Sequence, residues 1–166
     1  MQTKHEYPTE KNHRLPREYY LGEITTAFTL CVQNKQPLFL DPAVVHDFIK
    51  VLITTLEHSN CIAPAYCFMP DHLHIILTGK AVDSDLWKTV VSYKQQTGYW
   101  LSRNMPAIGW QKDFYDHIIR SEATIATQVR YILDNPVRKG LVSSWQDYPY
   151  KGSIGCSLDD ILSGIM

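Results

Sequence analysis

The hydrophobic and polar positions in the first half of the chain follow two different periods. Residues 23–33 are rich in Thr, Phe and Val, which predicts a first strand. Residues 41–58 begin with an Asp-Pro pair and then repeat apolar positions at helical spacing, which predicts a helix. Residues 61–69 and 72–78 predict two strands joined by a tight turn. This half therefore predicts a strand, a helix and a hairpin.

The second half of the chain predicts two helices separated by one strand. The helical pattern extends over about residues 83–103, and residues 112–119 favour a fourth strand. Ser121 is a suitable N-cap for a last helix, and Pro136 should end that helix near residue 135. The predicted order βαββαβα indicates an α+β protein, with a ferredoxin-like antiparallel sheet and helices packed on one face of it.

The length and polarity of the chain indicate one domain with two extensions. A chain of 166 residues is long enough to bury a sizeable core but suits a single domain. Residues 1–20 are polar and contain two prolines, so we expect a flexible N-terminal arm. The predicted elements occupy residues 21–152, and residues 153–166 form the expected C-terminal tail.

The charged residues are unevenly distributed along the chain. The net charge of −1 argues weakly against a nucleic-acid partner. However, residues 21–87 contain three Lys or Arg and seven Asp or Glu, whereas residues 88–151 contain nine and five. Such a basic half attracts phosphates, although solvated helix faces also explain it. The candidate DNA-contacting residues are Arg14, Arg17, Lys94, Lys112, Arg120, Arg130, Arg138 and Lys139.

The apolar segments and the cysteines restrict the expected location of the protein. No apolar run is long enough to span a membrane, and no secretory signal begins the chain. The four cysteines lack Cys-x-x-Cys spacing, which argues against a redox motif or a zinc ribbon. We therefore expect reduced thiols in a cytoplasmic protein without a membrane partner.

Two histidines separated by one residue are the first candidate site. Strand side chains alternate between faces, so His72 and His74 point the same way and Leu73 points to the other face. Two imidazoles on one face can hold a divalent cation. On its own the pair is a weak signal, because two half-buried structural histidines would produce the same pattern.

A tyrosine and an asparagine on the last predicted helix are the second candidate site. Tyr131 and Asn135 are four residues apart and lie off the apolar stripe of that helix, so they share one polar face. The phenol is a potential nucleophile, and the amide oxygen is a potential metal ligand. An ordinary amphipathic tyrosine and a helix-stop asparagine are the structural alternatives.

Several segments of the chain resemble a known family. Residues 131–142, Tyr-Ile-Leu-Asp-Asn-Pro-Val-Arg-Lys-Gly-Leu-Val, resemble a segment of the REP-associated tyrosine transposases of the single-tyrosine HUH transposase superfamily. Residues 69–77, Met-Pro-Asp-His-Leu-His-Ile-Ile-Leu, resemble the HUH segment of that family. The matches keep the order and spacing of the family, and three more segments contribute to them: residues 13–16, 110–120 and 145–150.

The resemblance implies an HUH endonuclease fold in residues 21–152 and a chemistry for both candidate sites. The family cuts single-stranded DNA and joins strands through a covalent phosphotyrosine. Tyr131 would be the nucleophile, His72 and His74 would bind the metal, and Asn135 matches the third ligand position. Glutamine or glutamate fills that third position in some relatives, so Asn135 is a softer assignment.

The resemblance also implies a cofactor and a partner. The expected cofactor is a divalent metal ion, magnesium or manganese, and zinc also suits these ligand types. The expected partner is single-stranded or hairpin DNA from repetitive extragenic palindromes, bound by a monomer or a homodimer. Such a protein would be associated with the nucleoid.

Two other functions fit part of the sequence. A histidine-triad nucleotide hydrolase also uses alternating histidines, but Ile76 occupies the position where its third histidine is needed. A domesticated hairpin-binding protein would keep the fold without cleavage. The presence of all the expected catalytic residue types favours activity over simple binding.

Overall fold

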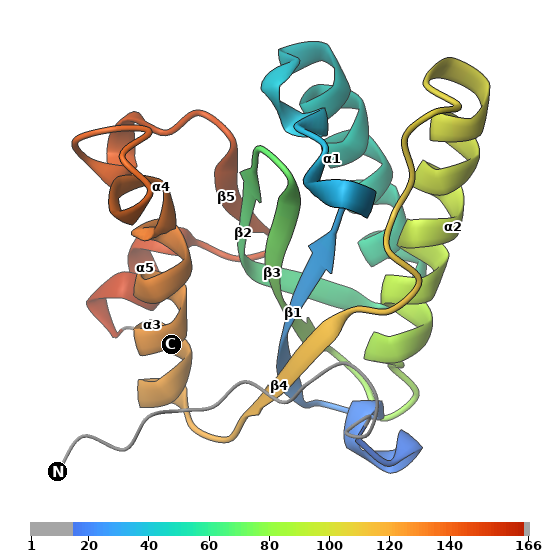
Figure 1. Cartoon of the computed structure of the whole chain (residues 1–166). Helices are drawn as coiled ribbons and strands as arrows, with labels where there is room; N and C mark the ends of the chain where they lie inside the picture. The colour runs from blue at the N-terminus through green and yellow to red at the C-terminus, as the bar shows by residue number, and fades with distance from the viewer. Residues whose placement is uncertain (1–14, 165–166) are drawn as a thin grey trace, which may run out of the picture.

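The computed structural model describes residues 15–164, which form one antiparallel sheet with helices packed against it (Figure 1). The strand order is β4-β1-β3-β2-β5. The predicted α+β fold is thereby confirmed. The strands are β1 (Thr25–Cys31), β2 (Cys61–Met69), β3 (His72–Gly79), β4 (Tyr115–Ile119) and β5 (Lys151–Ile154).

The helices begin where side chains cap their first turns. Asp41, Asp85 and Ser121 each accept a hydrogen bond from a backbone N–H of the helix that follows, as N-cap residues do. The α-helices of the described residues are α1 (Pro42–His58), α2 (Leu86–Asn104), α3 (Glu122–Leu133), α4 (Asn135–Arg138) and α5 (Leu158–Ser163). The short 3-10 helices are η1 (Arg17–Tyr20), η2 (Gln33–Lys35), η3 (Leu38–Leu40) and η4 (Trp145–Asp147).

Helices cover both faces of the sheet, so the prediction of helices on one face was wrong. Helices α1 and α2 lie on one face, and α3 and α5 lie on the other (Figure 1). Two separate hydrophobic cores result, and β3 contributes Leu73 and Ile75 to the first and Ile76 to the second. Strand β2 is almost continuously buried and apolar, and the middle of β3 contains three consecutive buried apolar residues, Ile75, Ile76 and Leu77. Such strands must be covered on both faces to remove their side chains from water.

The fourth strand begins later than the sequence predicted. β4 starts at Tyr115, whereas the pattern predicted a start at residue 112. The Lys94 ammonium on α2 accounts for the difference, because it donates hydrogen bonds to the backbone carbonyls of residues 111, 112 and 113 at 2.7, 3.2 and 3.3 Å. These three carbonyls therefore accept hydrogen bonds from a side chain of α2 just before β4 begins.

Residues near both ends of the described chain belong to the folded body. Residues 1–14 of the predicted arm lie outside the described residues, and Tyr20 at its predicted end is only 1% exposed and packs in the first core. β5 pairs with β2, so the domain boundary expected after residue 152 falls inside a strand. α5 then packs against α3, and Ile161 enters the second core. Among residues 15–164, no helix has the length and hydrophobicity to cross a membrane.

Candidate functional site

The two histidines of β3 lie on the sheet face that α3 covers. Leu73 between them enters the core beneath α1 and α2, so strand alternation turns His72 and His74 to the opposite face. Their Nε2 atoms are 3.1 Å apart, and their ring planes meet at 86°. The predicted pairing of the imidazoles on one face is therefore present in the structure.

The other ring nitrogen of each histidine has its own hydrogen-bond partner. His72 Nδ1 lies 2.6 Å from Asp71 Oδ1, and His74 Nδ1 lies 3.0 Å from Thr29 Oγ1 on β1. Metal-binding histidines are usually oriented in this way, with one nitrogen held by a carboxylate or hydroxyl and the other directed at the ion. Two nitrogens each about 2.1 Å from one ion can be separated by the observed distance. The donor set therefore fits a divalent cation.

The electrostatic environment keeps His74 neutral. Burial, together with the charges of the nearby His72 and Arg138, lowers its pKa to about 3. A neutral imidazole is the form that binds a metal ion. Near neutral pH, His74 therefore need not lose a proton before it can bind a cation.

Helix α3 presents one tyrosine to solvent beside the sheet. Its apolar side, including Val129 and Ile132, is buried in the second core. Tyr131 projects from that helix and is 47% exposed, whereas Asn135 at the start of α4 is 7% exposed. The structure therefore gives an accessible phenol on α3 and a buried asparagine at the start of α4, and their roles in a common site stay predictions.

Helix α3 ends at Leu133, close to the end predicted from Pro136, and the short helix α4 follows it directly. Asp134 between α3 and α4 has αR geometry, and the backbone N–H groups of Arg138 and Lys139 donate to residues 134 and 135 at 3.0 Å. The path therefore continues for one more turn. Arg138, seven residues after Tyr131, consequently returns to the same side as the tyrosine.

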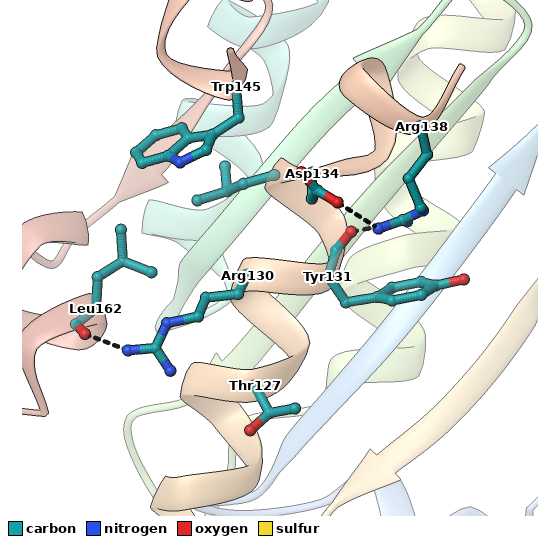
Figure 2. Close-up of a pocket in the computed structure, with 8 residues that line it drawn as sticks. Thr127, Arg130, Tyr131, Asp134, Arg138, Trp145 and Leu162 are labelled. Carbon is teal, nitrogen blue, oxygen red and sulfur yellow. Dashed lines mark hydrogen bonds and ion pairs between the residues drawn. The ribbon is translucent and has the colours of Figure 1, made fainter. Parts of the chain in front are cut away.

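Arg138 contacts the tyrosine directly and acts on His74 only through its charge. The guanidinium carbon lies 4.1 Å from the centroid of the Tyr131 ring, and its Nη2 donates to the Tyr131 carbonyl oxygen at 2.9 Å. The same positive charge is close enough to lower the pKa of His74. Figure 2 shows the Tyr131 ring and Arg138 on one side of α3, while Arg130 extends the other way to the carbonyl of Leu162.

An open pocket of about 500 Å³ borders the nucleophile candidate. It lies along α3 between α4, η4 and α5 (Figure 2). Its lining combines two guanidinium groups with apolar side chains, which suits a charged ligand that also has flat apolar surfaces. The lining residues are Thr127, Arg130, Tyr131, Leu133, Asp134, Arg138, Trp145 and Leu162.

The predicted DNA-contacting residues do not form one surface. Arg17 forms an ion pair with Asp85 at the start of α2, and Lys94 on α2 is bound to loop carbonyls. Both are thus committed to contacts on the α1–α2 side, away from α3. Lys112, Arg120, Arg130, Arg138 and Lys139 are exposed, and Arg14 lies outside the described residues.

Two functional partners were missed in the sequence. Asp71 could have been found, because it directly precedes the first histidine and is a common partner for imidazole. Thr29 carried no such signal, since only the pairing of β1 with β3 places it opposite His74. No group of three His, Cys, Asp or Glu residues able to hold a metal is found within residues 15–164, and the amide of Asn135 lies outside that set of residue types.

The fold and the site together define a class of protein. It is an antiparallel α+β domain in which a His-x-His strand faces a helix that carries an exposed tyrosine. The family model described as "Transposase IS200 like" matches residues 21–135. This match covers both histidines, the tyrosine and Asn135 of the candidate site.

The relatives of the chain specify the class further. A REP-associated tyrosine transposase of Escherichia coli (strain K12) is 30% identical over 140 residues, which cover 81% of this chain and 79% of the relative. A candidate REP-associated tyrosine transposase of Haemophilus influenzae is 26% identical over 134 residues, or 74% and 76% of the two chains. The chain therefore belongs to the IS200-like transposase family, and its relatives place it among the REP-associated tyrosine transposases.

A solved structure agrees with this assignment. The structure of a REP-associated tyrosine transposase bound to a REP hairpin matches with a TM-score of 0.71 and 26% identity, covering 84% of this chain and 82% of that chain. The resemblance drawn from the sequence is thus confirmed at the level of the family and the fold. The roles of individual site residues remain predictions.

Proposed function

We propose that this protein cuts and rejoins single-stranded DNA beside a hairpin, through a covalent bond between Tyr131 and the DNA. The observation that carries the proposal is that the His72 and His74 Nε2 atoms lie 3.1 Å apart on the sheet face covered by α3, the helix that carries the exposed Tyr131. This arrangement combines a candidate cation site with a candidate nucleophile. Together they can transfer a phosphodiester, because the phenol can attack phosphorus while a bound cation would neutralise charge on the phosphate.

The proposed substrate is a hairpin from a repetitive extragenic palindrome with a single-stranded flank. This choice of substrate is supported by the similar REP-associated tyrosine transposase, whose structure was solved bound to a REP hairpin. The exposed basic residues Arg120 and Lys139 lie near the ends of α3 and α4 and would attract phosphates there. Such a substrate would place the protein at the nucleoid, in the cytoplasm.

The proposed reaction is a direct exchange of phosphate ester bonds. The Tyr131 hydroxyl oxygen forms a bond to phosphorus while the bond from phosphorus to the 3′ oxygen breaks. The phenol proton leaves to solvent or a nearby base, and the departing 3′ oxygen takes up a proton. Because the phosphotyrosine is itself a phosphodiester, the 3′ hydroxyl can later attack it and rejoin the strand without another energy source.

The chain's own residues would hold a divalent ion at this site. His72 and His74 would bind it through Nε2, and Asn135 would supply an amide oxygen. Magnesium or manganese suits a site that combines nitrogen and oxygen ligands with phosphate oxygens. A bound ion would neutralise charge on the phosphate and orient it toward the nucleophile.

Trapping of a protein–DNA adduct tests the proposal. Labelled hairpin oligonucleotides with single-stranded flanks, from repeats near the gene, are incubated with magnesium or manganese and resolved on a denaturing gel. We expect an adduct with the wild type and none with Tyr131→Phe, because that variant lacks only the attacking oxygen. The matched control is Tyr99→Phe, since Tyr99 is also exposed, at 70%, but lies on α2.

The outcomes separate the enzyme from a binding protein. Hairpin affinity should change less than about twofold in both variants, since a single hydroxyl contact contributes little. Hairpin binding without an adduct in any of the three proteins would indicate a domesticated DNA-binding protein. An adduct that persists in Tyr131→Phe would assign the nucleophile to another residue.

A further inference from the structure

Arg138 has more partners than a side chain that only attracts phosphates requires. Its guanidinium covers the face of the Tyr131 ring at 4.1 Å and donates to the Tyr131 carbonyl at 2.9 Å. Its Nη1 donates to Asp134 Oδ2 at 3.3 Å. All three contacts are made within the segment that carries the candidate nucleophile, and two of them are made to Tyr131 itself.

These contacts restrict how the tyrosine ring can move. A tyrosine on an exposed helix face ordinarily exchanges between rotamers, and fixing one rotamer costs conformational entropy. A guanidinium above the ring adds a favourable cation–π contact, which favours one rotamer over the others. The carbonyl bond and the contact with Asp134 fix the guanidinium in turn. The ring of Tyr131 is thus held before any DNA is bound.

We propose that Arg138 is a positioning residue that holds the Tyr131 ring in the orientation from which its hydroxyl attacks DNA. The proposal rests on the proposed function of Tyr131 as the nucleophile. This role differs from the sequence prediction, in which Arg138 was one of eight candidate DNA-contacting residues and had no role of its own. A contact with DNA would contribute to affinity, whereas a positioning residue contributes to the rate of attack.

The chemistry of the side chain explains why arginine is needed. A guanidinium is flat, so it can lie on an aromatic ring and still donate in its own plane to two oxygens. A lysine ammonium has the same charge but concentrates it on one atom. It could approach the ring or the carbonyl, but it could not maintain the three contacts that Arg138 makes. Substitution by lysine therefore separates positioning from charge.

The experiment compares Arg138→Lys with the wild type on the hairpin substrate with a single-stranded flank. The rate of adduct formation is measured at saturating DNA in a single turnover, and hairpin affinity is measured separately over a range of salt concentrations. Arg103→Lys is the matched control, because Arg103 is also exposed but lies in the last turn of α2. Both substitutions preserve the net charge.

We expect the rate of adduct formation to fall about 10- to 100-fold in Arg138→Lys, because small errors in the position of a nucleophile cost rates of this size. Affinity and its salt dependence should stay within about twofold of the wild type, and Arg103→Lys should retain both. The proposal would be overturned by an unchanged rate at saturating DNA. The proposal would also be overturned if only the affinity and its salt dependence fell, because Arg138 would then be a phosphate contact.

A second measurement does not depend on cleavage. Nuclear magnetic resonance of tyrosine labelled in the ring reports the environment of Tyr131, with Tyr131→Phe used to assign its signal. The Tyr131 signal should shift in Arg138→Lys and not in Arg103→Lys. Absence of an adduct in the wild type would reject the proposed function, while this spectrum would still show whether Arg138 holds the ring. An unshifted signal would reject the positioning role even if cleavage occurs.

Discussion

The two faces of the sheet are built from the same strands but differ in what their side chains do. The face beneath α1 and α2 is filled with large aromatic side chains, among which Phe39 contacts Phe48 and Phe68 at ring-centroid distances of 5.5 and 5.0 Å. The face beneath α3 has a smaller core that includes Ala65 and Cys67. Beside that smaller core lie the histidine pair and the exposed tyrosine.

The difference shows how one strand can serve stability and chemistry together. Alternate residues of β3 enter the aromatic core, whereas His72 and His74 between them face the other way. The aromatic face therefore anchors the strand, and the histidines need not contribute to its stability. Three predictions test this division, from the largest expected effect to the smallest.

A substitution in the aromatic face should mainly lower stability. Phe68 is fully buried, and Phe68→Ala should lower the free energy of unfolding by about 3–5 kcal/mol, because it removes a large side chain and leaves a cavity. Urea denaturation followed by circular dichroism measures this. Tyr131→Phe on the other face is the comparison and should change stability by less than about 0.5 kcal/mol. Equal losses in the two variants would contradict the division between the faces.

The histidine face should respond to mild acid. Because the pKa of His74 is lowered to about 3, the unfolded chain binds a proton in the pH range where the folded chain does not. Stability is then fully present above the unfolded pKa of about 6.5 and is lost as the pH falls. Without divalent metal, we expect a loss of roughly 2 kcal/mol between pH 7 and pH 5.

His74→Gln separates this effect from other titrating groups. The fall in unfolding free energy between pH 7 and pH 5, measured by urea denaturation at each pH, should be clearly smaller in the variant. Parallel falls in the two proteins would mean that another group is responsible. Acid sensitivity would then not distinguish the α3 face.

The carboxylate behind His72 should affect metal binding more than folding. Asp71→Asn keeps the shape of the side chain but removes the charge next to His72 Nδ1. Loss of such a partner typically weakens metal binding about 10- to 100-fold. Calorimetric titration with manganese measures the change, and Asp83→Asn serves as the control, because Asp83 is exposed and outside the site. Unchanged manganese affinity in Asp71→Asn would exclude this orienting role.

Local patterns determined much of the protein from the sequence alone. The strand pair at residues 61–78, the capped helix at Ser121 and the shared face of His72 and His74 were all predicted. They could be predicted because strand alternation, helix periodicity and capping depend on neighbouring residues. The same reasoning predicted that Tyr131 and Asn135 share a helix face, whereas the structure places the exposed Tyr131 on α3 and the buried Asn135 at the start of α4.

Long-range contacts determined the rest. Coverage of both sheet faces, pairing of β5 with β2, and the bond between Thr29 and His74 each join segments that are far apart in the sequence. The place of Arg138 over Tyr131 depended on the extra turn α4, which follows the predicted end of α3 and was not predicted from the sequence. Periodicity indicates which way a side chain points from its own element. Only the packing of the elements against one another decides what that side chain meets.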